Sequence, residues 1–253
     1  MAEKNTTLAI KPGRVKRLAA AAVILLILAV FVIIGYFVAQ HFLEGIHQEE
    51  LFKEHLGTLD ISAAPVTEKE RDEYNVAPDH PRYIHIPSIG VNKARVLALG
   101  LKKVGADGKQ QLDSPKNISD VGWYDCGINP IAEKRCDNPT LPGAGITDIA
   151  AILTGHTCFS RTLRCVFDSI SKLKNGDSII IERGDGEKIN YTVRQVEVMN
   201  LADVDMAKAM RPIKPGEEGL TLITCAGTYQ GAMDANGVPT ADKRVLVYAV
   251  RDK

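Results

Sequence analysis

Two residues with reactive side chains stand at the ends of apolar runs in the second half of the chain. Cys225 ends the run GLTLITC, and His156 ends the run AAILTGH. A cysteine attacks carbonyl carbons as its thiolate, and a neighbouring histidine can take up the thiol proton. Loops that follow strands often carry such groups. The two residues predict nucleophilic acyl transfer, and a buried structural thiol with a structural histidine is the alternative interpretation.

A third residue, Arg244, opens the last apolar run, RVLVYAV. Acyl transfer develops negative charge on a carbonyl oxygen, and donors in a dry site stabilise that charge. Because consecutive strands commonly pair, this run is expected beside the run that ends at Cys225. An arginine at a strand edge is more often a solvated or ion-paired surface residue, so its position alone assigns it no role.

Short β runs dominate from Arg82 onward and must position these three residues. They are rich in Ile, Val, Leu, Thr and Tyr, and Gly, Pro, Asn and Asp separate them. The runs cover residues 82–87, 94–99, 109–112, 149–154, 178–183, 187–198, 219–225 and 244–250. Asp107-Gly108 and Gly184-Asp185-Gly186 have the composition of hairpin turns. Brief helical patterns cover 166–174 and 202–210, and the whole predicts a closed or nearly closed β-barrel.

An uncharged apolar stretch of 22 residues, Leu18 to Ala39, lies far upstream of the β runs. A helix needs about 20 apolar residues to cross the hydrocarbon core of a bilayer. The apolar core of a cleaved signal peptide is shorter, roughly 7–15 residues. We therefore expect one uncleaved transmembrane helix over residues 18–39.

The charges that flank this stretch predict its orientation. Residues 1–17 contain the single acid Glu3 and five cations, Lys4, Lys11, Arg14, Lys16 and Arg17, whereas residues 40–54 contain one cation, Lys53. Positively charged flanks stay in the cytoplasm. We expect residues 1–17 to form a cytoplasmic basic tail. Everything after residue 40 is then extracellular, anchored to the cell membrane by a single pass.

Residues 40–81 are expected to form a helix and a linker. Phe42, Ile46, Leu51, Leu56 and Leu59 follow a helical ladder among charged residues, which indicates an amphipathic helix over 41–62. Residues 63–81 contain three prolines and five acidic residues, and they predict a linker or a loosely packed arm.

The overall charge excludes one broad class of function. Lys plus Arg total 31 and Asp plus Glu total 31, so the formal net charge is zero. Proteins that bind nucleic acid usually have a basic excess or a strongly basic face. We therefore expect no nucleic-acid partner.

Five cysteines are present, and thiols outside the cell tend to pair. Cys126 and Cys136 lie ten positions apart, and Cys158 and Cys165 lie seven apart, so each pair can close a small ring. Four reduced thiols are one alternative, and a zinc site is another that lacks the usual C-x₂₋₄-C spacing. The favoured prediction is two disulfides, Cys126–Cys136 and Cys158–Cys165, a free Cys225, and no metal or cofactor.

Several of these segments resemble those of one enzyme family. TLITC is similar to the TLxTC signature that carries the catalytic cysteine of sortases, and ILTGH is similar to the strand that delivers their catalytic histidine. VFDSISKLKNGDSIII resembles the helix-turn-strand that follows, and KRVLVYAV resembles the last strand, which begins with the family's arginine. IHIPSIGVNKARV resembles the opening strands, and DVGWY followed by LPGAG is similar to a segment of the class E and F groups. The resemblance covers about residues 82–253.

The resemblance implies a mainly β fold, a sortase-like eight-stranded barrel with short helices, preceded here by the transmembrane helix. It implies a cysteine transpeptidase that cleaves an LPxTG-like sorting signal and joins the acyl group to an amine on the cell wall or another protein. Cys225 would be the nucleophile, His156 the acid/base, and Arg244 the residue that holds the substrate backbone or the oxyanion. Thr224 would orient the substrate and line the oxyanion site, and Thr221 is a further expected substrate-binding residue.

Two features depart from the family pattern. The 18 residues between Cys225 and Arg244 are a long separation, and Cys158 and Cys165 flank the loop after His156. Two other functions stay open at this point. One is an exported cysteine protease that releases its product to water, and the other is a non-enzymatic exported adhesion or sensor domain.

Overall fold

A computed structural model describes residues 12–104, 109–125, 141–229 and 240–253. The chain divides into two compact units, Met1–His47 and Gln48–Lys253. Helix α1, Pro12–Thr58, begins in the first unit and ends in the second. Within the described residues, Val23–Thr58 is the one helix long and apolar enough to cross a membrane. Its apolar side chains from Val23 to Leu43 are exposed, as expected of a helix that faces lipid.

Helix α1 is uninterrupted across the two segments that the sequence separates into an apolar stretch and an amphipathic helix. It ends at Thr58, four residues before the predicted end. Asp60 adopts a positive φ of 53°, Ile61 N donates to Leu56 O (2.9 Å), and Asp60 N donates to Gly57 O (3.2 Å). This pattern is a Schellman motif, which satisfies the last carbonyls of a helix and stops it.

The buried face of α1 differs from the predicted ladder. Phe42 and Ile46 are 52% and 40% exposed, whereas Phe52 and Leu56 are 1% and 6% exposed. Burial is thus confined to the last turns of the helix, where these residues join an apolar cluster with Ile61. Apolar residues continue upstream into the membrane stretch, so their spacing could not indicate where burial begins.

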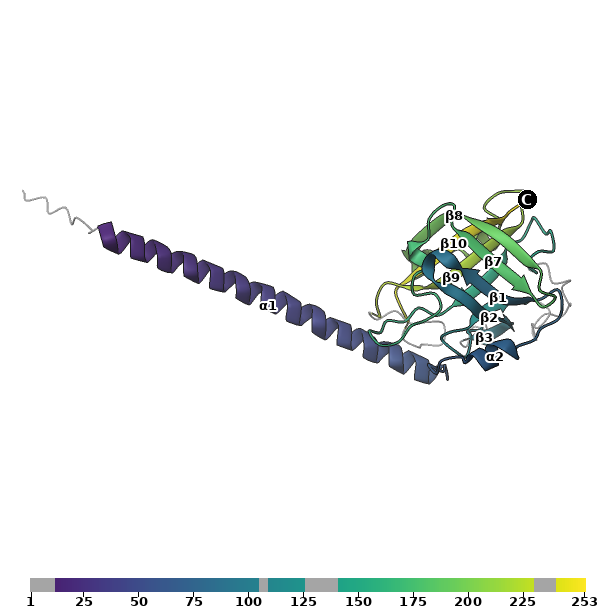
Figure 1. Cartoon of the computed structure of the whole chain (residues 1–253), viewed down its shortest axis with the longest axis horizontal. Coiled ribbons are helices and arrows are strands. Elements are labelled where there is room, and N and C mark those ends of the chain that lie inside the picture. Colours follow the sequence, from purple (N-terminus) through teal and green to yellow (C-terminus); the bar gives the residue numbers. More distant parts are fainter. Residues whose placement is uncertain (1–11, 105–108, 126–140, 230–239) are drawn as a thin grey trace, which may run out of the picture. The chain divides into compact units, whose positions relative to one another are not determined.

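Eight strands close into a barrel in the order β1-β2-β5-β6-β9-β10-β8-β7. Figure 1 labels β1, β2, β7, β8, β9 and β10 of this barrel. They are β1 (Pro81–Ile86), β2 (Val91–Leu99), β5 (Val121–Tyr124), β6 (Ala151–Gly155), β7 (Ser178–Arg183), β8 (Lys188–Asn200), β9 (Gly219–Ala226) and β10 (Lys243–Arg251). Ile, Leu and Val side chains from all of these strands fill the interior. The eight-stranded barrel predicted from the sequence is confirmed.

One predicted strand lies outside the barrel, and one barrel strand was missed. Residues 109–112 form β4 (Lys109–Leu112), which pairs with β3 (Leu101–Val104) in a separate two-stranded sheet. Its place in the barrel is taken by β5, which is four residues long and contains a glycine, Gly122. So short a run gives little periodic signal, although all of its first three residues are buried.

The predicted helical segments are shorter than expected. Residues 166–174 contain turns and a single 3₁₀ turn, η3 (Ile170–Lys172), and 202–210 contain η4 (Leu201–Asp203) and α3 (Met206–Ala209). The turn at Gly184-Asp185-Gly186 joins β7 to β8 as predicted. The predicted turn at Asp107-Gly108 lies outside the described residues.

The segment between α1 and the barrel packs more closely than a loose arm. Helix α2 (Glu68–Asp72) begins with a capping box, in which Thr67 and Glu70 bond each other's backbone N–H groups. Val66 is buried, and Tyr74 donates its hydroxyl proton to the Val96 carbonyl on β2 (2.6 Å). These contacts tie the proline-containing segment to the barrel wall.

Candidate active site

Three adjacent strands deliver the three residues expected to carry the chemistry. β6 and β9 are parallel neighbours, with Thr154 opposite Ile223, so His156 and Cys225 follow at the same edge of the sheet. β10 runs antiparallel to β9 and places Arg244 directly opposite Cys225. The pairing of β9 with β10 confirms the strand neighbour expected from the sequence.

His156, Cys225 and Arg244 line one cavity of about 460 Å³. Its wall is part polar and part apolar, and residues far apart in the sequence contribute to it. The other lining residues are His55, Leu59, Ser114, Pro115, Tyr124, Ile152, Thr154, Gly155, Met206, Met210, Ile223, Thr224 and Thr240. The cavity can therefore hold a peptide segment against the thiol, the imidazole and the guanidinium together.

His156 is held as a neutral imidazole. Its Nε2 lies 2.9 Å from the Pro115 carbonyl; since a carbonyl oxygen can only accept, Nε2 carries the proton and Nδ1 is the acceptor nitrogen. Burial lowers the pKa of His156, and this effect outweighs the Pro115 bond, which raises it. A neutral histidine beside a thiol can act as a base.

A close approach just before His156 requires glycine. A Cβ on Gly155 would lie 2.6 Å from a ring carbon of Phe167, well inside van der Waals contact. Phe167 N also donates to the His156 carbonyl (3.0 Å). The glycine thus lets the chain after the loop pack directly against the histidine backbone.

Backbone carbonyls anchor the guanidinium of Arg244. Nη1 donates to the carbonyls of Ala241 and Lys243, both at 2.8 Å, and Nη2 donates to Thr240 Oγ1 (3.2 Å). Neutral acceptors leave the positive charge uncompensated by a carboxylate at these contacts. A cation held in this way can stabilise an oxyanion that develops in the cavity.

The two threonines expected to bind substrate have different positions. Thr224 lines the cavity, and its hydroxyl donates to the Gly155 carbonyl (2.7 Å), so Thr157 must donate the further 2.7 Å bond between their hydroxyls. Thr221 is buried, donates to the Ala209 carbonyl (2.8 Å), and is absent from the cavity lining. These bonds give Thr221 a structural place and make Thr224 a link between β9 and the His156 strand.

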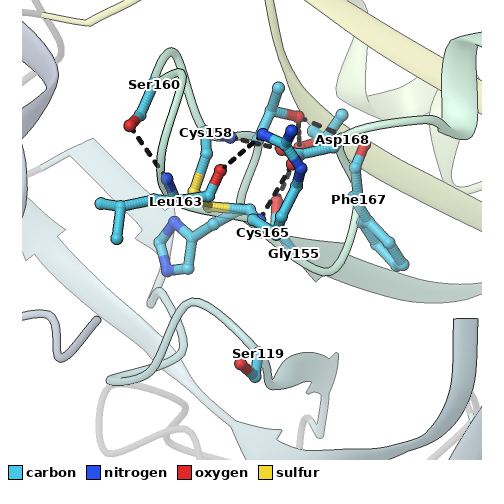
Figure 2. The surroundings of a disulfide bond; sticks show 12 residues. Ser119, Gly155, Cys158, Ser160, Leu163, Cys165, Phe167 and Asp168 are labelled. Atoms are coloured by element: carbon cyan, nitrogen blue, oxygen red, sulfur yellow. Dashed lines mark hydrogen bonds between the residues drawn. A yellow bond between two sulfur atoms is a disulfide. The ribbon is translucent and has the colours of Figure 1, made fainter. Parts of the chain in front are cut away.

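A disulfide closes the loop after His156. Cys158 and Cys165 are bonded, with their Cα atoms 5.1 Å apart, as the spacing predicted. Figure 2 shows Asp168 beside this bond, where its two carboxylate oxygens accept from Cys158 N (2.6 Å) and Cys165 N (3.0 Å). Because both thiols are used in the disulfide, they are not zinc ligands in this state.

The remaining cysteine predictions have different outcomes. Among the described cysteines, Cys225 is free and partly buried, as predicted. The predicted Cys126–Cys136 pair lies outside the described residues. A free thiol in the cavity wall and a disulfide in the neighbouring loop fit a nucleophile kept apart from the structural cysteines.

Sequence reasoning missed two residues of this site. Tyr229 is 3% exposed and lies within electrostatic range of both Cys225 and Arg244, and burial is the main cause that raises its pKa. His55 lines the cavity from helix α1. The spacing of Phe52, His55 and Leu59 along one helix face was the available signal for His55.

Comparison with known proteins identifies the barrel. The Sortase domain family model matches residues 84–252. Among solved structures, sortase C-1 from Actinomyces oris is 23% identical, covering 81% of this chain and 99% of its own, with a TM-score of 0.43. Sortase C from Clostridium perfringens SM101 is 18% identical, covering 83% and 90%, with a TM-score of 0.39. A lid mutant of Streptococcus agalactiae Sortase C1 is 20% identical, covering 83% and 89%, with a TM-score of 0.42. The curated proteins contain no match to the sequence.

Proposed function

The chain belongs to the sortase family, and on that premise we propose that it is a membrane-anchored cysteine transpeptidase. Its substrate is an LPxTG-like sorting signal, which it cleaves between Thr and Gly. The acyl group then passes to an amine on the cell wall or on another surface protein. The observation that carries this proposal is the convergence of Cys225, His156 and Arg244 on one cavity.

The first half-reaction forms a thioester. Neutral His156 takes the Cys225 proton, and the thiolate attacks the carbonyl carbon of the scissile bond. Arg244 stabilises the resulting oxyanion. His156 then gives the same proton to the leaving amine as the C–N bond breaks, which leaves an acyl group on sulfur and a neutral imidazole.

The second half-reaction repeats these steps with a different nucleophile. The acceptor amine attacks the thioester, His156 takes its proton, and the tetrahedral intermediate collapses with release of the Cys225 thiolate. His156 then returns the proton to sulfur. The neutral state of His156, which burial favours, suits a residue that must accept a proton at the start of each half-reaction.

The location of the enzyme follows from its N-terminal segment. Helix α1 is long and apolar enough to span a membrane, and the five cations before Leu18 favour a cytoplasmic N-terminus. The catalytic barrel then lies outside the cell, where sorting signals and surface amines meet. Protease added to intact cells is expected to digest the barrel; protection until the membrane is permeabilised would contradict this orientation.

The full chain in detergent tests the reaction directly. It is incubated with LPxTG peptides, with and without triglycine as the amine, and analysed by mass spectrometry. We expect an acyl adduct on Cys225 and a ligated product when triglycine is present. Product released only to water, whatever the amine concentration, would identify a cysteine protease. Neither reaction, together with a Cys225 that iodoacetamide does not alkylate, would favour an adhesion or sensor domain.

A further inference from the structure

The last turns of helix α1 touch the loops on both sides of the cavity. Within the unit Gln48–Lys253, the segment 48–58 contacts the loop that follows β6 and the loop that follows β9. We call the first, residues 156–169, the disulfide loop. We call the second, residues 227–242, the return loop; its residues 230–239 lie outside the described part of the chain.

Gln48 forms two hydrogen bonds with the backbone of one residue of the return loop. Tyr229 N donates to Gln48 Oε1 (2.6 Å), and Gln48 Nε2 donates to the Tyr229 carbonyl (3.3 Å). An amide side chain that satisfies both backbone groups of one residue fixes that residue's backbone in place. Tyr229 lies four positions after Cys225, so the helix restrains the chain just beyond the nucleophile.

Phe52 joins the two loops to each other. Its ring is 1% exposed and lies 6.1 Å from the ring of Phe159 in the disulfide loop and 6.3 Å from the ring of Tyr229. The Phe159 and Tyr229 rings are themselves in edge-to-face contact at 5.0 Å. Such aromatic contacts contribute beyond their buried area, so Phe52 of the helix, Phe159 of the disulfide loop and Tyr229 of the return loop form one packed cluster.

His55 is the polar residue of this helix face that reaches the cavity. It is 8% exposed, and its ring lies 5.8 Å from the ring of Tyr229. It lines the cavity together with His156 and Cys225. It is also near enough to His156 for a positive charge on His55 to lower the pKa of His156, in addition to the larger effect of burial. His55 thus lies between the nucleophile's loop and the catalytic base.

We propose that His55 is an active-site residue supplied by the membrane helix: it positions Tyr229 and His156 around Cys225 and sets the electrostatic environment of the base. The inference rests on the proposed function for the identity of the base and the nucleophile. It goes further by placing the end of α1 inside the catalytic site, so that the anchor and the active site share one element.

Several charged or titratable groups face the two histidines. His156 interacts electrostatically with two of these groups: His55 lowers the pKa of His156, and Asp120 raises it. Asp120 is itself paired with Arg95 through two hydrogen bonds of 2.9 and 2.7 Å. Other elements around the cavity contribute further titratable groups. They are Cys225 on β9, Arg244 on β10, Tyr124 on β5 and Tyr229 in the return loop.

The test substitutes His55→Phe in the full chain. Phenylalanine keeps an aromatic ring against Tyr229 but removes the polar, chargeable imidazole from the cavity. His47→Phe is the matched control, because His47 lies two turns earlier on the same helix and is exposed. The measurements are kcat and KM on an LPxTG peptide, the pH dependence of Cys225 alkylation by iodoacetamide, and the melting temperature.

For His55→Phe we expect kcat to fall about 10- to 100-fold, the range for a misplaced catalytic group, with little change in KM. Because the electrostatic contribution of His55 to the lowered pKa of His156 is removed, that pKa is expected to rise, and the acid limb of both pH profiles moves to higher pH. His47→Phe keeps wild-type values. If His55→Phe melts early, His55→Gln replaces it; Gln also removes the titratable imidazole, and the same shift of the acid limb is expected.

Folded variants that keep wild-type kcat and an unmoved acid limb would overturn the role of His55 and reduce it to packing. A wild-type protein that leaves LPxTG peptides intact would contradict the proposed substrate instead. The alkylation profile needs no sorting signal, so it decides the role of His55 in either case.

Discussion

The disulfide loop and the return loop both begin next to the cavity, but different bonds hold them. A covalent bond between Cys158 and Cys165 closes the disulfide loop, and Asp168 bonds the backbone of both cysteines. In the return loop, Asp242 Oδ1 accepts from Thr228 N (2.7 Å), and Asp242 N donates to the Thr228 carbonyl (3.0 Å). The disulfide loop carries His156, the proposed base, and is covalently restrained. In the return loop, between Cys225 and Arg244, hydrogen bonds tie the described residues together.

The difference shows two ways of fixing a catalytic group. A short disulfide stabilises the folded state by restricting the conformations of the unfolded chain. Reduction breaks the bond, so this stabilisation depends on the redox state. Hydrogen bonds such as those of Gln48 and Asp242 depend on the folded neighbours that supply them. Helix α1 contacts both loops, through Glu49 and Phe52 on the disulfide loop and through Gln48 on the return loop. The helix therefore contacts both loops, whose Phe159 and Tyr229 rings also contact each other directly.

The strongest test removes the proposed nucleophile, which lies on β9 two residues before the return loop. Cys225→Ala should abolish the acyl adduct and all ligation, because no second residue of the cavity is proposed to accept the acyl group. Intact-mass spectrometry after incubation with an LPxTG peptide measures this. The melting temperature should stay near that of the wild type. An adduct on another residue of the variant would show that the nucleophile had been misidentified.

Removing the base from the disulfide loop should have the next largest effect. His156→Ala is expected to lower kcat/KM by ~10²- to 10⁴-fold, the usual contribution of general acid–base catalysis. Steady-state cleavage of an LPxTG peptide measures the loss, and His47→Ala serves as an exposed control on α1. A loss below tenfold would remove His156 from the mechanism.

Removing the guanidinium of Arg244, on β10 just after the return loop, should have the third largest effect. Arg244→Ala is expected to lower kcat/KM by ~10²- to 10³-fold if the guanidinium stabilises the oxyanion. Arg244→Lys should rescue this only partly, because an ammonium lacks the planar fork that bonds several carbonyls at once. Arg194→Ala, at an exposed position on β8, is the control. Full activity of the lysine variant would mean that a positive charge at this position is enough to stabilise the oxyanion, without the planar guanidinium.

The two kinds of restraint can be separated by reduction. Replacing Cys158 and Cys165 with serine should destabilise the barrel by about 2.5 kcal/mol, the chain-entropy value for so short a loop. Gly227→Ala in the return loop should cost about 1–2 kcal/mol, because φ is +83° and a Cβ would lie 1.9 Å from Asp242 Oδ1. Melting curves with and without a phosphine reductant measure both.

Reductant should lower the melting temperature of the wild type and of Gly227→Ala by more than that of the double serine variant, which keeps only the predicted Cys126–Cys136 bond. A wild type that is insensitive to reductant, although its disulfide is cleaved, would mean that the hydrogen bonds of Asp168 hold the disulfide loop by themselves.

The smallest expected effect is on acid stability. Burial lowers the pKa of His156 below its ordinary value of 6.5, so the folded state binds fewer protons than the unfolded state. The stability from this group is complete above pH 6.5 and is lost as the pH falls from there toward the folded pKa. His156→Gln should reduce the drop in melting temperature between about pH 7.5 and about pH 5. An unchanged drop would assign the acid sensitivity to a group other than His156.

Much of this protein could be predicted from local patterns in its sequence. The apolar stretch predicts a membrane-spanning helix because its length matches a bilayer, and helix α1 is long and apolar enough to cross one. Short β runs bounded by turn residues predict the barrel, and His156 and Cys225 stand out because each ends such a run. The Cys158–Cys165 bond was predictable because seven positions close a small ring. Each of these features depends on residues that are near one another in the chain.

Other features depend on which elements become neighbours, and these were decided by the tertiary structure. β5 was missed because its four residues acquire their burial from β2 and β6 rather than from their own pattern. The parallel pairing of β6 with β9 brings His156 and Cys225 to one cavity although 68 residues lie between them in the sequence. His55 looked like one of several histidines on a polar helix. It reaches the cavity because the disulfide loop and Tyr229 pack against the last turns of that helix. The spacing of Phe52, His55 and Leu59 indicated a shared helix face, but not which distant elements would cover it.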